Sequence, residues 1–470
     1  MTTTTLVDDS SPSPAAVEKM HPACRRTTPS TVFCPRVLII AEAANPDWVS
    51  VPLEGWAHSQ ALAQLAKVHL VTQIRNRNAI TQAGLREGVD FTAIDSERVA
   101  KPLRRVVDII RGGEGKGWTT VSAMEALPYY YFEQLVWKTF KKELQSRQFD
   151  LVHRITPLSP TRPSLLAQQC ARIGVPFVMG PLNGGVPWPK QFNQARRREH
   201  EWLSYLRDVY KLLPGFQSTR RSAAAIIIGS RDTFKQMPLI YQRKSVYIPE
   251  NAIDPARFTV SRQGPVRTPL QVAFLGRLVP YKGADMLLEA AAPLIRDGKV
   301  FVDIIGDGPQ RDQLRQIVER EQISAGVRID GWVAHDQVQH RLIGSDLFAF
   351  PSIREFGGAV VLEAMALGLT PLVIDYGGPA ELVTAETGFK MPMASREQIV
   401  LNLRQMLTRI SDDPDPLQQM GQRARQRVFD LFTWSAKARQ TLEVYRWVLG
   451  ERAHKPNFGM PLPENTPPLQ

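Results

Sequence analysis

Short apolar runs, typical of buried parallel strands, alternate with longer helix-like stretches along most of this chain, and the alternation occurs twice. In the first half the runs lie at residues 37–41, 68–72, 150–153, 176–179, 224–228 and 244–248. Residues 255–269, with three prolines and a glycine, interrupt the pattern. It then resumes with runs at residues 271–275, 300–305, 327–330, 346–350 and 371–375. The sequence therefore predicts an α/β fold of two doubly wound domains, each a parallel sheet covered by helices, facing each other across a cleft.

The same pattern divides the chain into segments. Residues 1–34 are rich in Thr, Ser and Pro and have no apolar signal-peptide core, so they are predicted to be a disordered tail. The proline-rich stretch 454–470 is predicted to be a second disordered tail. Between them, residues 35–250 and 251–430 are predicted to form two Rossmann-like domains, followed by a helix over residues 431–453.

Composition excludes several classes of protein. No apolar run reaches the length of a membrane span, and the three cysteines show no metal-ligand spacing, which favours a reduced, cytoplasmic compartment. The net charge of +12 comes from dispersed lysines and arginines. Since no zinc-finger spacing, aromatic ribonucleoprotein motif or basic zipper accompanies them, nucleic acid is not an expected partner.

The segment 354–368 carries the most informative chemistry. Its Gly357 and Gly358 open a helix-like stretch at the end of a strand, where free backbone N–H groups suit a phosphate. Glu355 lies before this helix and Glu363 inside it, so both carboxylates can accept hydrogen bonds from hydroxyl groups in one cleft. The alternative is structural, with Glu355 as a helix cap and Glu363 as a solvated side chain.

A basic loop follows the first strand of the second half. Gly276 permits a close turn at the strand end, and Arg277 and Lys282 follow before Gly283. Arg offers a planar fork to phosphate oxygens and Lys a mobile point charge, so the two cations would balance a diphosphate. The alternative is a pair of solvated loop cations. A further turn at residues 306–308 has two glycines, and an ordinary turn explains it as well.

In order and spacing these elements resemble the second domain of the family-four retaining glycosyltransferases, which have the GT-B fold. The matching motifs are Gly276-Arg277-x4-Lys282-Gly283, Gly306-x-Gly308 and Glu355-x7-Glu363. The resemblance implies that Arg277 and Lys282 hold the diphosphate of a nucleotide-sugar donor. It also implies that Glu355 contacts the transferred sugar and that Glu363 accepts hydrogen bonds from the ribose hydroxyls.

The resemblance implies further contacts in the same site. The backbone N–H groups of Phe356, Gly357 and Gly358 would meet the sugar and the phosphate, and Trp332 would lie against the base. The helix near residues 434–449 would cross back to the first domain. The resemblance implies no cofactor and no divalent metal at the donor site.

The first half matches the family less well. It lacks a glycine-rich loop after the first strand, and the family's His-x-His element reads His153-Arg154-Ile155, so only His153 matches. His153 is a candidate catalytic residue; the alternative is a strand histidine whose ring is hydrogen bonded. Arg154 and Thr156 are candidates at the same edge. The loop 180–188 follows a strand of this half and is predicted to face the cleft, where it could contact an acceptor.

The resemblance implies a retaining glycosyltransferase. It would move a sugar from a nucleoside diphosphate sugar to a hydroxyl of a saccharide or lipid-linked acceptor, in polysaccharide or glycolipid synthesis. Alternatives on the same scaffold are a nucleotide-sugar epimerase and a glycogen-synthase-like polymerase. A different class is a catalytically silent sugar-nucleotide-binding protein, against which the presence of both glutamates and both cations argues.

Residues 98–117 interleave six lysines and arginines with apolar residues. A basic amphipathic helix there would attach the protein peripherally to an anionic membrane surface on the cytoplasmic side. The alternative is a core-facing helix with a solvated basic side.

Overall fold

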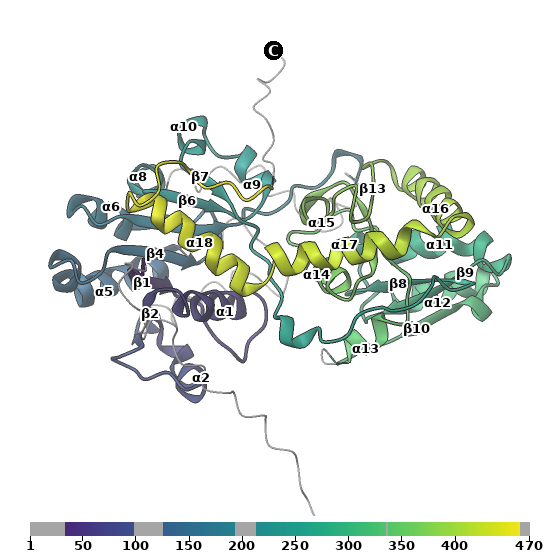
Figure 1. Cartoon of the computed structure of the whole chain (residues 1–470), viewed down its shortest axis with the longest axis horizontal. Coiled ribbons are helices and arrows are strands. Elements are labelled where there is room, and N and C mark those ends of the chain that lie inside the picture. Colours follow the sequence, from purple (N-terminus) through teal and green to yellow (C-terminus); the bar gives the residue numbers. More distant parts are fainter. Residues whose placement is uncertain (1–32, 98–125, 193–212, 335–336, 461–470) are drawn as a thin grey trace, which may run out of the picture.

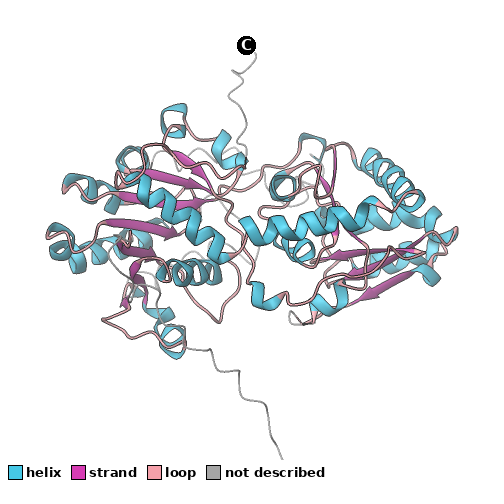
Figure 2. Ribbon diagram, viewed as in Figure 1, coloured by secondary structure: helices cyan, strands magenta, loops and turns pink. Residues whose placement is uncertain are grey.

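The computed structural model describes residues 33–97, 126–192, 213–334 and 337–460. These residues form two α/β units side by side (Figures 1 and 2). The predicted amphipathic helix at 98–117 lies outside the described residues, as do residues 1–32 and 461–470 of the predicted tails. The second predicted tail starts too early, because Met460 is 4% exposed and packs in the apolar core of the second unit.

The first sheet has seven parallel strands in the order β3-β2-β1-β4-β5-β6-β7. Along β1 the apolar side chains alternate between two clusters, Leu38 and Ile40 in one and Val37 and Ile39 in the other. Both faces of the sheet are therefore covered, as the continuous apolar runs predict. The strands are β1 Arg36–Ala41, β2 Lys67–Gln73, β3 Phe91–Ile94, β4 Leu151–Thr156, β5 Phe177–Leu182, β6 Ala225–Ile228 and β7 Ser245–Tyr247. The helices are α1 Val51–Ala63, α2 Arg77–Gln82, α5 Ala126–Gln145, α6 Leu165–Arg172, α8 Phe216–Ser222, α9 Arg231–Lys235 and α10 Leu239–Gln242.

The second sheet has six parallel strands in the order β10-β9-β8-β11-β12-β13. These are β8 Leu270–Leu275, β9 Val300–Ile305, β10 Val327–Asp330, β11 Leu347–Phe350, β12 Thr370–Ile374 and β13 Phe389–Met391. The helices are α11 Ala284–Arg296, α12 Arg311–Arg320, α13 Val338–Leu342, α14 Ala359–Ala366, α15 Gly377–Leu382, α16 Arg396–Asp412, α17 Pro416–Leu431 and α18 Trp434–Val448. The predicted fold class, two doubly wound Rossmann-like units, is confirmed.

In the second sheet the order of connections reverses between β8 and β11, which are hydrogen-bonded neighbours. Doubly wound sheets bind ligands at such a point, beyond the carboxyl ends of the strands. The loop after β8 carries the basic residues, and the loop after β11 with helix α14 carries the two glutamates, so the topology brings these two segments together.

The chain passes between the two units twice, and the two passages are hydrogen bonded to each other. In the linker after β7, the N–H of Ile253 donates to the carbonyl of Phe432 at 2.8 Å. The N–H of Trp434 donates back to the carbonyl of Ile253 at 3.3 Å. The linker and the junction between α17 and α18 therefore form one short hinge.

Helix α18 returns to the first unit (Figure 1) and packs against α1. Its Ala438, Val444 and Tyr445 belong to one of the two apolar clusters of the first sheet. The α18 Thr441 hydroxyl and the His58 Nε2 of α1 are 3.1 Å apart. Within the described ranges, every helix is too short or too polar to cross a membrane.

Candidate functional site

The basic loop after β8 and the turn after β9 are packed backbone against backbone. The N–H of Leu278 donates to the carbonyl of Asp307 at 2.9 Å. A Cβ on Gly306, whose φ is 142°, would be 2.0 Å from the Gly276 carbonyl oxygen, which no side chain tolerates. The glycines at 306–308 thus have a structural explanation, since they let the neighbouring strand end support the basic loop.

The loop after β11 rests on the other side of the basic loop. The N–H of Ile353 and the hydroxyl of Ser352 both donate to the carbonyl of Tyr281, at 2.9 and 3.1 Å. Gly283, with φ 80°, precedes α11, and a Cβ there would be 2.6 Å from the Pro351 carbonyl oxygen. These contacts place Lys282 beside the segment that begins at Glu355.

The ammonium of Lys282 and the carboxylate of Glu355 form an ion pair. Their side chains are 16% and 18% exposed, and the Lys282 Nζ also lies 5.1 Å from the centre of the Phe350 ring. Burial lowers the pKa of Lys282 to about 8. The second predicted cation, Arg277, is exposed. The structure therefore brings the predicted phosphate-binding lysine and the predicted sugar-binding glutamate into direct contact.

The start of α14 offers donors to a ligand. Gly358, with φ 68°, precedes the helix. In the described part of the chain, the backbone N–H groups of Phe356, Gly357 and Gly358 make no hydrogen bond. The N–H of Gly378 in α15 donates to the Glu355 carbonyl at 3.0 Å and so fixes the opposite side of the loop. Three free N–H groups next to a lysine suit an anion.

The remaining predicted residues of the second domain lie on the same sheet edge. Glu363 is half-buried within α14, and burial raises its pKa to about 7, an effect that the charge of Arg257 opposes. Trp332 follows β10 and is 76% exposed, so its ring is open to contact.

The loop 180–188 of the first domain contacts Arg354, Phe356 and Tyr376 of the second domain. The Phe356 ring packs on Gly185, and the Tyr376 hydroxyl donates to the Pro187 carbonyl at 2.7 Å. The guanidinium of Arg354 lies 4.8 Å from the centre of the Trp188 ring. As predicted from its place after a strand, this loop faces the second domain.

His153 is fully buried, and both of its ring nitrogens are occupied. Nε2 lies 2.8 Å from the Gly180 carbonyl and Nδ1 lies 2.6 Å from the Tyr445 hydroxyl. Since a carbonyl only accepts, Nε2 carries the proton and Nδ1 accepts from Tyr445. Burial lowers the pKa of His153 to about 4. This geometry argues against the predicted catalytic role and favours the alternative of a strand histidine with a bonded ring.

The side chains of the two other candidates on β4, Arg154 and Thr156, also make their hydrogen bonds within the first domain. Arg154 is buried, and its Nη1 donates to the Arg162 carbonyl at 2.9 Å. The Thr156 hydroxyl lies 3.1 Å from both the N–H and the carbonyl oxygen of Ala43. Both residues therefore hold loops of the first domain in place.

Three ionisable residues near the hinge were not predicted. Glu54 of α1, Glu250 of the linker and Lys437 of α18 each have a buried charged-group atom without a hydrogen-bond partner among the described residues. Burial raises the pKa of Glu54 to about 8 and that of Glu250 to about 7, and it lowers the pKa of Lys437 to about 7. The sequence does indicate that Lys437 is buried, because it lies four residues before Thr441 and eight before Tyr445, on the buried side of α18.

Residues 258–427 match the protein-family model described as Glycosyl transferases group 1. The match covers most of the second domain, and the two parallel-sheet domains agree with the GT-B arrangement that the sequence resemblance implied.

Similarity to named proteins covers part of the chain. A glycogen synthase of Mycobacterium tuberculosis is 32% identical over 222 residues, which are 46% of this chain and 52% of that protein. A D-inositol 3-phosphate glycosyltransferase of Kineococcus radiotolerans is 33% identical over 202 residues, 38% of this chain and 45% of that protein. The chain thus spans about half the length of the curated relatives it matches.

Solved structures resemble nearly the whole described fold. A glycosyltransferase of Rickettsia africae has a TM-score of 0.54 at 15% identity and covers 89% of this chain and 100% of its own. HepE of Anabaena, solved in complex with UDP, has a TM-score of 0.52 at 16% identity and covers 87% and 99%. At these identities the likeness establishes the fold.

Proposed function

We propose that this protein is a retaining glycosyltransferase that moves a sugar from a nucleoside diphosphate sugar to a hydroxyl group of a saccharide or lipid-linked acceptor. The observation that carries the proposal is the contact between Lys282 and Glu355 beside three free backbone N–H groups. A cation with unpartnered N–H donors suits a phosphate, and a carboxylate suits sugar hydroxyls. The relatives' names, which include a glycogen synthase and a putative colanic acid biosynthesis glycosyltransferase, support polysaccharide synthesis as the setting.

In the proposed reaction, the bond between the anomeric carbon and the donor phosphate oxygen breaks while the acceptor oxygen bonds to the same carbon. Negative charge grows on the departing diphosphate, and Lys282, Arg277 and the N–H groups before α14 stabilise it. The acceptor attacks from the face that the diphosphate leaves, and a phosphate oxygen of the leaving group takes the acceptor proton. Glu355 orients the sugar through its hydroxyls, and Glu363 holds the ribose.

The proposed mechanism includes no cofactor and no divalent metal, because the two cations and the helix start supply the positive charge. We place the reaction in the cytoplasm, in keeping with the cysteine content. Attachment to an anionic membrane surface through residues 98–117 remains part of the proposal for the lipid-linked acceptor, although those residues lie outside the described part.

The test begins with thermal unfolding of the full chain in the presence of a panel of nucleoside diphosphate sugars. A donor should raise the unfolding temperature of the wild-type protein and have a smaller effect on Lys282→Ala. Transfer from that donor, with and without EDTA, is then followed by product analysis, and NMR of the new linkage reports its anomeric configuration. If no nucleoside diphosphate sugar raises the unfolding temperature, the proposal is refuted. If the new linkage has the inverted anomeric configuration, the retaining mechanism is refuted.

A glycogen-synthase-like polymerase is a second candidate, favoured by the 32% identity to a glycogen synthase over 222 residues. It would use the same donor chemistry, with the end of a growing glucan as its acceptor. Product length separates the two candidates, since a polymerase adds many sugars to one acceptor. An epimerase would change the donor without any acceptor.

A further inference from the structure

One tryptophan of the first domain reaches the residues next to the ion pair of the proposed donor site. Trp188 follows β5, and its ring packs against the apolar core of the second domain. The guanidinium of Arg354 lies 4.8 Å from the centre of this ring. The ring of Tyr281 lies 6.3 Å away, nearly perpendicular to it at 88°. These two residues directly precede Glu355 and Lys282, respectively, in the sequence. A single side chain therefore contacts both loops that carry the ion pair.

Both contacts have the geometry of specific aromatic interactions. A guanidinium within about 6 Å of a ring centre is attracted to the ring face, and indole is the best ring for this contact. Aromatic pairs favour the edge-to-face arrangement that Trp188 and Tyr281 adopt. The Trp188 Nε1 is buried and has no hydrogen-bond partner among the described residues. The ring therefore holds its place through its face and edge, and not through its N–H group.

The residue two positions before Trp188 contacts the same segment of the second domain. The Arg354 Nε donates to the Val186 carbonyl at 3.4 Å. A Cβ on Gly377 would be 2.4 Å from the Glu355 carbonyl oxygen and 3.3 Å from a methyl carbon of Val186. Gly377 is thus in close contact with both residues. The backbone of Glu355 is therefore packed, through Gly377, against the loop that carries Trp188.

The two loops of the donor site are also joined within the second domain, but only through their backbones and Ser352. The N–H of Ile353 and the hydroxyl of Ser352 donate to the Tyr281 carbonyl at 2.9 and 3.1 Å. The contacts of Trp188 are with the side chains on either side of this junction. We propose that Trp188 is a positioning residue for glycosyl transfer, which holds the loops of the ion pair in the alignment that the donor diphosphate and the transferred sugar require.

This role rests on the proposed function, and it adds the first domain to the donor site. All of the donor contacts that the sequence resemblance implies come from the second domain, so the donor can bind there without Trp188. The two loops reach the reacting alignment only when the first domain supplies the indole ring. Loss of the ring should therefore affect the transition state more than the bound donor, which lowers kcat with little change in KM.

The experiment uses the full chain and three replacements of Trp188. Alanine removes the ring, leucine restores much of its volume without an aromatic face, and phenylalanine restores a ring without the N–H group. Arg354→Met and the double variant Trp188→Leu/Arg354→Met test whether the two side chains act together. Transfer kinetics with the donor identified by the thermal screen give kcat and KM. Calorimetry gives the affinity for the donor's nucleoside diphosphate, and thermal unfolding gives stability.

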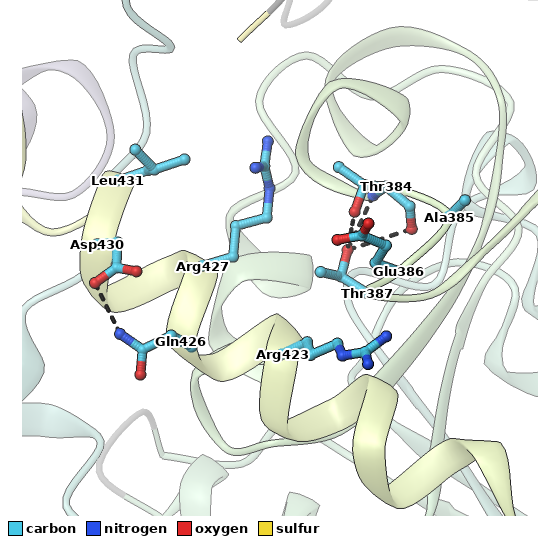
Figure 3. Close-up of a pocket in the computed structure, with 9 residues that line it drawn as sticks. All are labelled: Thr384, Ala385, Glu386, Thr387, Arg423, Gln426, Arg427, Asp430 and Leu431. Carbon is cyan, nitrogen blue, oxygen red and sulfur yellow. Dashed lines mark hydrogen bonds between the residues drawn. The ribbon is translucent and has the colours of Figure 1, made fainter. Parts of the chain in front are cut away.

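Two matched controls separate positioning from a general loss of packing or charge. Trp137→Ala removes a half-buried tryptophan that packs on an apolar cluster of the first domain. Arg423→Met removes an exposed guanidinium from α17, where Arg423 lines an open pocket beside the loop 384–387 (Figure 3). Trp137→Ala should lower the unfolding temperature and keep the wild-type kcat. Arg423→Met should change neither quantity.

We expect Trp188→Ala and Trp188→Leu to lower kcat roughly tenfold, which is the size of two such ring contacts, with KM and nucleotide affinity within about threefold of the wild type. Trp188→Phe should recover kcat to within about threefold of the wild type, because it keeps the face and edge contacts. Arg354→Met should also lower kcat, and the fall in the double variant should be smaller than the product of the two single falls.

The failure of this role is distinguishable from the failure of the proposed function. If the wild-type protein transfers sugar and Trp188→Leu transfers it at the same rate, Trp188 is not a positioning residue and the proposed function stands. The role is also overturned if Trp188→Phe is as impaired as Trp188→Ala, or if Trp137→Ala loses kcat to the same extent. Absence of transfer by the wild type with every donor would instead refute the proposed function, and the role of Trp188 with it.

Discussion

The ammonium of Lys282 and the carboxylate of Glu355 form an ion pair between the loops that end β8 and β11. Both side chains are largely buried, so each depends on the other for compensation of its charge. A diphosphate that reaches Lys282 competes with Glu355 for the same ammonium. In the proposed reaction, donor binding therefore frees Glu355 to accept hydrogen bonds from the sugar at the moment the sugar arrives.

The two predicted diphosphate cations should respond differently to truncation. Arg277→Ala and Lys282→Ala should each remove a charge-assisted contact with the donor, worth about 1.5–3 kcal/mol. The loss should appear in kcat as well as in KM, because charge grows on the leaving group. Lys282→Ala should also lower the unfolding temperature, since it leaves Glu355 buried without its partner, whereas exposed Arg277→Ala should not. Transfer kinetics and thermal unfolding of both variants provide the measurement; wild-type transfer rates in both would remove the diphosphate assignment.

The two glutamates should divide the work between nucleotide and sugar. Glu363→Gln should weaken the binding of the donor's nucleoside diphosphate alone, because the ribose loses a carboxylate acceptor. Glu355→Gln should spare this nucleotide affinity and impair transfer, because its contact is with the sugar. Calorimetry with the nucleoside diphosphate and transfer assays with the identified donor measure both effects. Equal losses of nucleotide affinity in the two variants would contradict this division of roles.

Glu363→Gln should also change stability in a direction opposite to its effect on binding. Burial raises the pKa of Glu363 from its ordinary value of 4.5 to about 7, so the folded state holds this proton more tightly than the unfolded state. Stability is then lost as pH rises from about 4.5 to 7, by about 3 kcal/mol in all. Gln cannot ionise, and the variant should unfold at a higher temperature than the wild type near pH 8. Near pH 4 the two should unfold alike.

A change of its hydrogen-bond partner Tyr445 should show that His153 contributes to stability and not to catalysis. Tyr445→Phe removes the hydroxyl that donates to the His153 Nδ1 and leaves a buried acceptor unpaired, which costs about 1–3 kcal/mol. The kcat of transfer should stay at the wild-type value, because neither residue reaches the cleft in this arrangement. Chemical denaturation and transfer assays on the same preparation measure the two effects. A fall in kcat with unchanged stability would instead return His153 to the catalytic site.

The central strands and the loops after β8 and β11 were predictable because short stretches of sequence are enough to indicate them. The apolar runs that became β8, β9 and β11 each end at a glycine or proline, and the expected boundaries differ from the observed ones by one residue or less. The edge strands β3 and β13 were missed. Only two of the four residues of β3 are buried, and β13 has just three residues, so neither shows a continuous apolar run.

The features that were not predictable depend on contacts between distant parts of the chain. The structural role of His153 depends on a hydrogen bond from Tyr445, which is 292 residues away in the sequence. The ion pair between Lys282 and Glu355 was not foreseen, since spacing along the sequence placed both residues at one sheet edge without saying that they touch. Likewise, Glu54, Glu250 and Lys437 lie in three separate segments, and only the return of α18 to the first domain brings them together.

The buried group of Glu54, Glu250 and Lys437 should make the effect of Lys437→Met depend on pH. Burial raises the pKa of both glutamates, and the positive charge of Lys437 opposes that rise. Without this charge the carboxyl groups hold their protons more tightly, and ionising them costs more above about pH 7. Burial also lowers the pKa of Lys437 to about 7, so the wild type bears the cost of a buried ammonium mainly at lower pH.

The stronger burial cost of the two carboxylates and the removal of the buried ammonium change the stability of Lys437→Met, relative to the wild type, in the same direction as pH rises. Relative to the wild type, Lys437→Met should be most stable near pH 6 and should lose stability as the pH is raised to about 9. Thermal unfolding across this range is the measurement. Arg439→Met, on the exposed side of the same helix, controls for the change in helix composition and should show no such trend. The triple variant Glu54→Gln/Glu250→Gln/Lys437→Met has no ionisable group left in the cluster, so its contribution to the pH dependence should disappear. A shift in unfolding temperature for Lys437→Met that is the same at both ends of the range would contradict both the lowered pKa of Lys437 and its interaction with the two glutamates.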